Sequence, residues 1–223
     1  MEQTRQEYIQ ALQLVQDKVT DMGKLAHEAV KKSVRALLNG DTTLANEVMR
    51  EDDRIDDMIV DIEDDCILLI AKQQPIAHDL RVIATGFKIS TDIERIGDHA
   101  FDIAKTVQEV LVPLDNKRMQ CVRELAECAI KMVGQAMKAY HEKDVQLADD
   151  VRKMDVEMDN IFEKTFYALS DFVTDEASRQ KRVTQLLFIA RFLERIGDHA
   201  VNIAEWVIYL ETAERIHHKK HLV

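Results

Sequence analysis

The amino-acid sequence predicts an all-α protein made of two tandem, duplicated, antiparallel three-helix bundles. Three observations support this fold class. The 223 residues include only six Gly and two Pro, too few for the many tight turns of an all-β protein. Apolar residues recur at the i, i+4, i+7 spacing of amphipathic helices. The heptapeptide ERIGDHA stands at 94–100 and again at 194–200, which indicates an internal repeat.

Two prolines and one Gly-containing turn divide the chain into six predicted helices. Asn39-Gly40-Asp41 ends the first helix, and Asp41 is suited to cap the second. Pro75 separates the second helix from the third, and Pro113 lies in the segment that divides the halves. The predicted helices are 3–39, 41–73, 76–111, 117–142, 144–174 and 177–212.

The second and third helices carry clear apolar stripes. The stripe on the second helix consists of Ile55, Ile59, Ile62, Cys66 and Leu69. The stripe on the third helix consists of Ile89, Ile93, Ile96, Ala100, Ile103 and Val107. Stripes of this kind predict the buried faces of bundle helices.

The last three helices are supported by the repeat. Between Leu37 and Val48, four residues recur 103 positions later: Asp41, Leu44, Ala45 and Val48 match Asp144, Leu147, Ala148 and Val151. Ile89 and Glu94 recur 100 positions later as Ile189 and Glu194. Short connections favour antiparallel packing within each half. We therefore expect one three-helix bundle over residues 1–112 and a second over residues 113–223, related by pseudo-twofold symmetry.

Composition and charge exclude several classes of protein. The formal net charge is −11, which argues against binding to nucleic acid or to an anionic membrane. Most of this charge, −9, belongs to residues 1–112. Cys66, Cys121 and Cys128 form no CxxC pair and are expected to be small core residues in a reducing compartment.

The sequence also gives no sign of a membrane or secreted protein. No apolar run approaches the roughly 20 residues of a membrane-spanning helix. The first ten residues, MEQTRQEYIQ, lack the apolar core of a signal peptide. We expect a soluble, cytoplasmic protein without direct membrane insertion.

Two acidic pairs occur in each half, on helices that are neighbours in the predicted bundles. Each pair has i, i+4 spacing, so its two side chains are neighbours on one helical face. The eight residues are Asp52, Asp56, Glu94 and Asp98 in the first half, and Asp155, Asp159, Glu194 and Asp198 in the second. If the paired helices pack together, each half assembles four carboxylates.

Clustered carboxylates repel one another, so a positive charge should offset them. Arg54, Arg95 and Arg195 are close enough in sequence to form ion pairs without any metal. Alternatively, an oxygen-rich cluster suits Mg²⁺, Ca²⁺, Mn²⁺ or iron. Because the arrangement recurs in both halves, we favour a metal site in each. Candidate further ligands one turn away are Asp102 and Asn202, and His99 and His199 are either nitrogen ligands or partly exposed polar residues.

These residues resemble the PhoU family of phosphate-signalling regulators over nearly the whole chain. The resemblance is carried by the two ERIGD motifs and by the aspartate pairs of the neighbouring helices. The longer form ERIGDHA…NIAE is present from Glu194 to Glu205, whereas the first copy departs from it at Asp102-Ile-Ala-Lys105. The run from Pro75 to Arg81 also looks like the family's link into its third helix.

Membership of this family would imply a regulator rather than an enzyme. Members are two tandem three-helix bundles, commonly homodimers, and some bind multinuclear iron or zinc clusters at the acidic motifs. They restrain phosphate uptake and the phosphate-starvation response as adaptors between a phosphate ABC transporter, through its ATPase subunit, and a sensor histidine kinase. The resemblance therefore implies metal ligands at the eight acidic residues, and no catalytic residue.

Three other readings of the sequence are possible in principle. A carboxylate-bridged di-iron or iron-storage protein would use Glu-x-x-His from each of two helices, but only Glu214-Arg-Ile-His217 has this form. A nucleotide-driven enzyme would need a phosphate-binding glycine loop, which is absent. A scaffold that binds no metal could use its acidic faces to dock basic partner surfaces, and this reading is compatible with the regulator role.

Overall fold

The computed structural model describes residues 2–108, 116–171 and 177–216. In these ranges the chain forms six α-helices and no strand, as the sequence predicts. The helices are α1 Glu2–Asn39, α2 Thr42–Gln73, α3 Ala77–Val107, α4 Asn116–Glu142, α5 Val145–Ser170 and α6 Ala177–Thr212.

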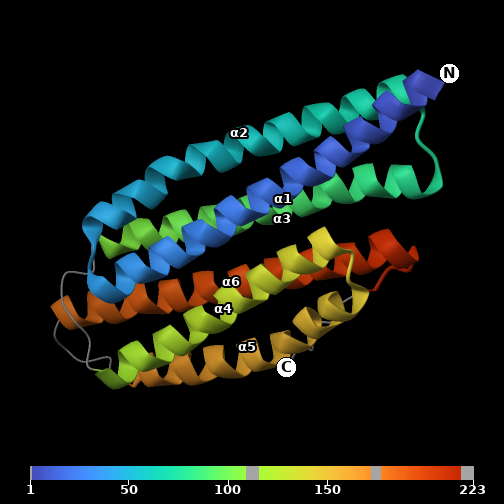
Figure 1. Cartoon of the computed structure of the whole chain (residues 1–223). Helices are drawn as coiled ribbons and strands as arrows, with labels where there is room; N and C mark the ends of the chain where they lie inside the picture. Colours follow the sequence, from blue (N-terminus) through green and yellow to red (C-terminus); the bar gives the residue numbers. More distant parts are fainter. Residues whose placement is uncertain (1, 109–115, 172–176, 217–223) are drawn as a thin grey trace.

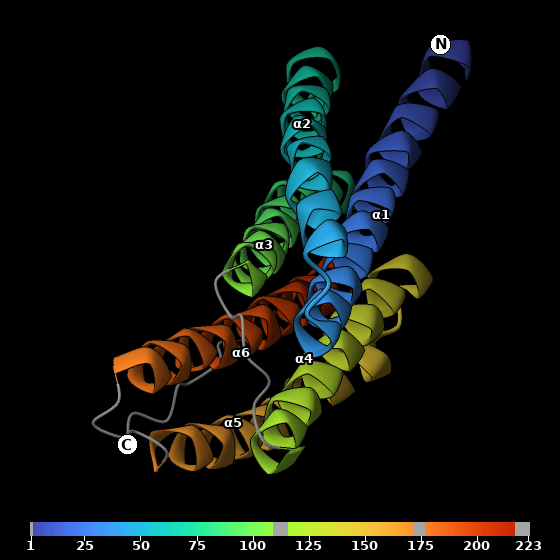
Figure 2. The same cartoon turned by 90° about the vertical axis from the view of Figure 1, so that its left-hand side faces the viewer.

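The six helices form two three-helix bundles, which confirms the predicted architecture. Within the first bundle α1, α2 and α3 each pack against the other two, and α4, α5 and α6 do the same in the second. The bundles meet through α3 against α6 and α1 against α4. Figures 1 and 2 show them stacked, with the long axis of one inclined to that of the other. The division between residues 112 and 113 lies outside the described residues and stays a prediction.

Equivalent capping residues begin the second helix of each bundle. A side-chain oxygen of Asp41 accepts a hydrogen bond from the Leu44 amide at 3.0 Å, and Asp144 accepts one from Leu147 at 2.9 Å. These caps satisfy amide groups that have no partner within the helix. The predicted ends of the third and fifth helices were too late, because α3 ends at Val107 and α5 at Ser170.

The predicted stripes supply much of the core. Every residue of the α3 stripe, from Ile89 to Val107, is buried. The α2 stripe is buried except for Ile59, which is partly exposed. Cys66 and Cys128 are buried, as expected, whereas Cys121 is only partly buried and departs from the expected core position.

Glycine allows close contact between α2 and α3 beside the acidic motif. A Cβ atom on Gly97 would lie 3.1 Å from Cδ1 of Ile55 and 3.3 Å from Oδ1 of Asp52. The equivalent Gly197 would place its Cβ 3.1 Å from Cγ of Met158 on α5. A side chain at either position would push the helices apart, so this tight contact offsets the poor helix propensity of glycine.

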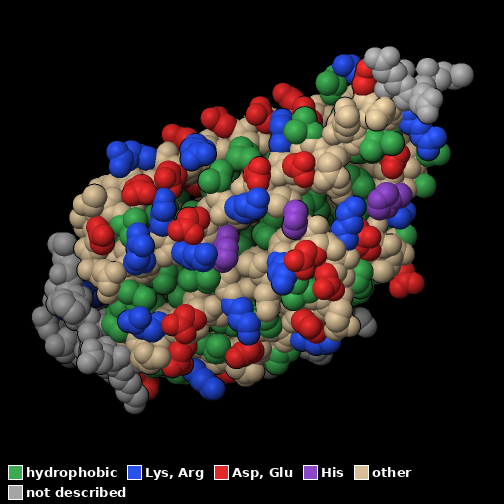
Figure 3. Space-filling view, in the orientation of Figure 1, with side chains coloured by type: hydrophobic (Ala, Val, Ile, Leu, Met, Phe, Trp, Pro, Cys, Tyr) green, Lys and Arg blue, Asp and Glu red, His purple; other side chains and the backbone are tan. Residues whose placement is uncertain are grey.

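None of the helices, within the described residues, has an apolar stretch long enough to cross a membrane. On the surface, acidic side chains line the edge of the molecule along which α2 runs (Figure 3).

Candidate functional site

The first acidic cluster lies where α2 crosses the motif on α3. Asp52 and Asp56 are one turn apart on α2, and Glu94 and Asp98 are one turn apart on α3. Oδ1 of Asp52 faces the backbone at Gly97, directly beside the turn that carries Glu94 and Asp98. The structure therefore brings together the four carboxylates that the sequence assigns to the first half.

Burial and mutual repulsion raise the pKa of three of these carboxyl groups. Burial, followed by repulsion from Asp56 and Asp98, raises the pKa of Asp52 from 3.8 to about 6. Burial and the charge of Asp98 likewise raise the pKa of Glu94, and burial and Asp98 raise the pKa of Asp56. Raised values mean that the folded protein disfavours the fully ionised cluster.

One arginine partly offsets the repulsion. Nε of Arg95 lies 3.3 Å from Oε2 of Glu94, and its Nη1 lies 2.9 Å from Oδ2 of Asp98. About half of the Arg95 side chain is exposed to solvent, and ion pairs at such positions contribute little. Among the described residues, Arg95 therefore pairs with two of the four carboxylates, Glu94 and Asp98.

The second cluster occupies the equivalent positions on α5 and α6. Its Asp155 and Glu194 side chains are more deeply buried than their counterparts in the first cluster. Asp155 on α5 is buried, with 8% of its surface exposed, whereas its counterpart Asp52 is only half-buried. The side chain of Glu194 is 12% exposed. Burial, and then the charges of Asp198 and Asp159, raise the pKa of Glu194.

Two arginines accompany the second cluster. Nη1 of Arg191 lies 2.7 Å from Oε1 of Glu194, and Nη1 of Arg195 lies 3.1 Å from Oδ2 of Asp198. Arg195 repeats the role of Arg95, but the position equivalent to Arg191 is Thr91. In the part of the chain that the structure describes, Arg191 therefore gives the second cluster an ion pair that has no counterpart at Thr91.

Carboxylate oxygens are suitable ligands for a hard metal ion, but in this structure the side chains do not converge on one point. Among the residues that the structure describes, no three His, Cys, Asp or Glu side chains are arranged to hold a metal ion. However, Oε2 of Glu194 is buried without a hydrogen bond, and burial followed by the neighbouring carboxylates raises the pKa of Asp52. Oxygen donors of this kind match Mg²⁺, Ca²⁺, Mn²⁺ and iron.

The candidate further ligands differ between the two halves. Burial and the charge of Asp98 raise the pKa of Asp102, so Asp102 belongs to the surroundings of the first cluster. Asn202, its counterpart, donates a hydrogen bond from Nδ2 to Oδ1 of Asp92 at 3.0 Å. In the rival di-iron motif, Glu214 is exposed and His217 lies outside the described residues.

The two motif histidines meet where α3 packs on α6. Their ring centroids are 5.8 Å apart. Nδ1 of His199 lies 2.8 Å from Oδ1 of Asp92, and His99 stacks on Phe192 at 5.7 Å. Burial, followed by the charge of His199, lowers the pKa of His99 to about 4. Both histidines therefore lie at the contact between the bundles.

This contact includes residues that the sequence analysis missed. Asp92 and Phe192 occupy equivalent positions in the repeat, and each contacts the histidine of the opposite half. The internal pseudo-twofold axis therefore passes between His99 and His199. The offset of 100 could have paired positions 92 and 192, but nothing in the sequence indicates that α3 meets α6.

The chain matches known proteins over most of its length. The model of the PhoU domain matches twice, at residues 19–107 and 122–207. A relative from Clostridium acetobutylicum, named a phosphate-specific transport system accessory protein PhoU homolog, is 36% identical and is matched over 98% of its own length and 96% of this chain. A relative of the same name from Rhizobium meliloti is 37% identical, over 83% of its length and 87% of this chain.

Solved structures of PhoU proteins also resemble this chain over most of its length. A crystal structure of PhoU from Pseudomonas aeruginosa has a TM-score of 0.86 and 33% identity, with 93% of this chain and all of that chain covered. The phosphate transport system regulatory protein PhoU from Streptococcus pneumoniae has a TM-score of 0.86 at 26% identity, over 94% of this chain and 99% of that one. The relatives are named as accessory proteins, which agrees with the expectation that this chain is not an enzyme. With two matching domains and the helices in the same arrangement, this chain belongs to the PhoU family.

Proposed function

We propose that this protein is a cytoplasmic accessory protein of phosphate transport and a negative regulator of phosphate uptake and of the phosphate-starvation response. The observation that supports this most directly is its identity of 36% with a phosphate-specific transport system accessory protein, over nearly the full length of both chains. In this role it is an adaptor between the ATPase subunit of a phosphate ABC transporter and a sensor histidine kinase.

The adaptor acts by binding rather than by chemistry. Long helices present wide faces to partner proteins, and the acidic first bundle suits a basic patch on one of them. If the adaptor binds the kinase state that dephosphorylates its response regulator more tightly than the other state, it increases the population of that state. A tenfold bias requires about 1.4 kcal/mol of differential affinity, which one interface readily supplies.

We also propose that the two acidic clusters bind metal. Asp52, Asp56, Glu94 and Asp98 would hold one site, and Asp155, Asp159, Glu194 and Asp198 the other. A bound divalent or multinuclear metal, with iron and zinc suggested by the family, would supply positive charge to the clustered carboxylates. To bind it, Glu94 and Asp98 must turn from Arg95 towards the metal.

Self-association as a homodimer is a further part of the proposal. Only the resemblance to the family supports it. Light scattering at micromolar protein concentration should give the mass of two chains, and a strict monomer of 25.7 kDa would contradict it.

Deletion of the gene in its own host tests the regulatory role. Phosphate-starvation genes are measured in high phosphate, in a strain that lacks any other PhoU copy. We expect persistent expression after deletion and restored repression when the wild-type gene is returned. Normal repression in the deletion strain would contradict the role. The adaptor mechanism has its own check, because a pull-down that recovers neither the kinase nor the transporter ATPase would refute it.

A further inference from the structure

A cavity of about 310 Å³ lies where the two bundles meet through α1 and α4. This volume is at the lower end of the range that small-molecule sites occupy. Val34 and Leu38 of α1 and Ile130 of α4 form an apolar part of its wall, and each is buried or partly buried. In Figure 3, apolar side chains at the left of the face that carries α1 and α4 lie between basic side chains above and below them. The cavity therefore offers an apolar floor to a ligand.

Cations outnumber carboxylates among the described residues that line the cavity. The cations are Lys31 and Arg35 of α1 and Arg123 of α4. Glu127 of α4 is the one carboxylate among these residues, and all four side chains are exposed. Lys31 lies 3.6 Å from Glu28 on its own helix, but both side chains are about half exposed, and such pairs contribute little. The lining therefore has an excess of positive charge in a chain whose net charge is −11.

The two arginines are available to a ligand. Neither Arg35 nor Arg123 forms an ion pair with any residue that the structure describes. Lys32, whose Nζ lies 2.6 Å from Oε1 of Glu47, is the main cause of the lowered pKa of Glu47, and Arg35 is the smallest contributor. Because Lys32 already neutralises Glu47, the guanidinium group of Arg35 remains free to bind an anion.

The internal repeat shows that the fold does not require this cavity. At the offset of 103, Val34 corresponds to Met137 at the other end of the contact between α1 and α4. The thioether of Met137 packs directly on Gly23 and occupies the space there. Val34 has a shorter side chain, so the equivalent space beside it stays open as the cavity.

The charges at the two ends of this contact also differ. Lys138 stands at the position equivalent to Arg35, and its Nζ lies 3.8 Å from Oε2 of Glu142. The residue equivalent to Glu142 is Asn39, so Arg35 lacks this partner. The position equivalent to Arg123 is an uncharged threonine. One end of the contact thus neutralises its cation, whereas the end that contains the cavity accumulates cations.

We propose that this cavity binds a small organic phosphate, whose phosphoryl oxygens contact Arg35 and Arg123 and whose organic part packs on Val34, Leu38 and Ile130. The planar guanidinium group matches a phosphate group with two parallel hydrogen bonds. A phosphate monoester carries between one and two negative charges more than a neutral ligand at pH 7, close to the excess charge of the lining. Inorganic phosphate has the same phosphoryl chemistry but makes no use of the apolar floor.

This site goes beyond the adaptor role and does not depend on it. Arg35 belongs to the first bundle and Arg123 to the second, so a bound phosphate would contact both bundles. Glu127 lines the same cavity one turn along α4 from Arg123, and its charge opposes an anion. Removal of the Glu127 charge should therefore strengthen binding, which a merely structural role of the cavity does not predict.

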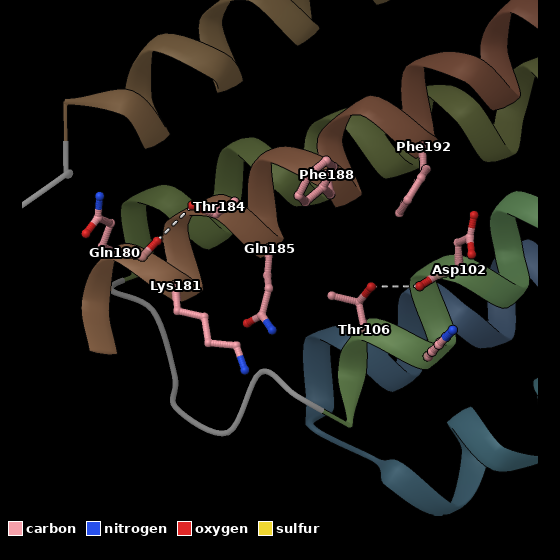
Figure 4. A pocket seen from close by; sticks show the side chains of 9 residues that line it. Asp102, Thr106, Gln180, Lys181, Thr184, Gln185, Phe188 and Phe192 are labelled. Atoms are coloured by element: carbon pink, nitrogen blue, oxygen red, sulfur yellow. Dashed lines mark hydrogen bonds between the residues drawn. The ribbon is translucent and has the colours of Figure 1, made fainter. Parts of the chain in front are cut away.

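A larger cavity, of about 710 Å³, lies between α3 and α6 (Figure 4) but suits an anion less well. The hydroxyl groups of Thr106 and Thr184 donate to carbonyl oxygens of their own helices, at 2.8 and 3.0 Å. Lys181 already interacts with another group of the molecule. The charge of Lys105 acts on the carboxylate of Asp102, which lines the same cavity.

Isothermal titration calorimetry of the full-length chain, in about 150 mM salt, tests the proposal. The probes are adenosine monophosphate, glycerol 3-phosphate and inorganic phosphate, and adenosine and glycerol are the controls without a phosphoryl group. We expect saturable binding of at least one of the two esters at one site per chain, more tightly than inorganic phosphate, and no binding of either control.

Substitutions at the cavity locate the bound phosphate. Arg35→Gln and Arg123→Gln should each weaken binding at least about tenfold, because each removes a hydrogen bond to a charged group. Glu127→Gln should strengthen it several-fold, because it removes the opposing charge. Lys138→Gln is the matched control, because it removes a cation at the position equivalent to Arg35, and it should leave the affinity unchanged. All four side chains are exposed, so the variants should fold, which circular dichroism checks.

Three results would overturn the inference: no saturable binding of any phosphate probe, equal binding of a control without a phosphoryl group, or affinities that Lys138→Gln changes as much as the arginine variants do. Binding that resists Arg123→Gln but is lost in Glu94→Gln would place the phosphate on a metal at the acidic cluster and would also overturn it. Binding of inorganic phosphate alone, with the expected response of the variants, would support the site and identify the free ion as its source.

Discussion

Neutralising Asp52 should stabilise the metal-free protein, although most substitutions of half-buried residues destabilise. The pKa of Asp52 rises from 3.8 to about 6 through burial and the neighbouring carboxylates, and each pKa unit corresponds to about 1.4 kcal/mol. The full difference is about 3 kcal/mol, and solvent screening at a half-buried group reduces it to about 1–2 kcal/mol. Asp52→Asn removes the charge and keeps the shape, so we expect a gain of this size at pH 7.

The gain should depend on pH in a defined direction. Because the folded protein binds the Asp52 proton more tightly than the unfolded chain does, the wild type loses stability as pH rises from about 4 to about 6. The variant lacks this titration. Its advantage should therefore be largest at pH 7 and should vanish towards pH 4, where the aspartate is protonated in the folded state and becoming so in the unfolded state.

Urea unfolding with a metal chelator present measures both effects, with Asp61→Asn as control. Asp61 is exposed on the same helix, and its substitution removes the same formal charge. The reasoning fails if Asp52→Asn is less stable than the wild type at pH 7, or if both variants gain equally. Adding metal at about 100 times its Kd should then stabilise the wild type by about 2.7 kcal/mol and Asp52→Asn by clearly less.

Three further predictions follow from named contacts. Asp41→Ala and Asp144→Ala should each lower the free energy of unfolding by about 1 kcal/mol through loss of a helix cap; no change in urea unfolding would contradict this. Gly134→Ala should destabilise by about 1 kcal/mol, because its Cβ would lie 3.0 Å from Cε1 and 3.2 Å from Nε2 of the His27 ring between α4 and α1, and the contact of Nε2 with the Ile130 carbonyl at 3.1 Å restrains that ring; a gain in stability, as expected from helix propensity alone, would refute it. Glu94→Gln should reduce the bound metal measured by elemental analysis while circular dichroism stays unchanged; full metal content would remove Glu94 from the site.

Local and repeated features of the fold could be predicted from the sequence. Helix stops at Gly40 and Pro75, and the buried stripe from Ile89 to Val107, follow from interactions within a few residues of each other. Helix ends without such a signal were predicted too late, as at Val107 and Ser170, because no Pro or Gly marks these positions. The repeat predicted the second bundle, because helices with similar sequences bury equivalent faces.

The candidate site could be predicted only in part, because the sequence indicates the spacing of its residues but not their burial. Residue spacing places Glu94 beside Asp98 on one helical face, and the repeat places Glu194 beside Asp198. Their degree of burial is not a property of spacing. Asp155 is buried and Asp52 only half-buried, although both stand at the same repeat position, because burial depends on side chains contributed by other helices.

The sequence by itself determined the helices, the duplication and the pairing of acidic residues, because these depend on periodicity and on residues close along the chain. Only the tertiary structure decided that α3 and α6 pack together, that Asp92 reaches His199, and that His99 stacks on Phe192. It also decided that Arg191 of α6 lies over the Phe162 ring of α5. These contacts join residues that lie far apart in sequence, and their energies depend on shape and burial that no local pattern encodes.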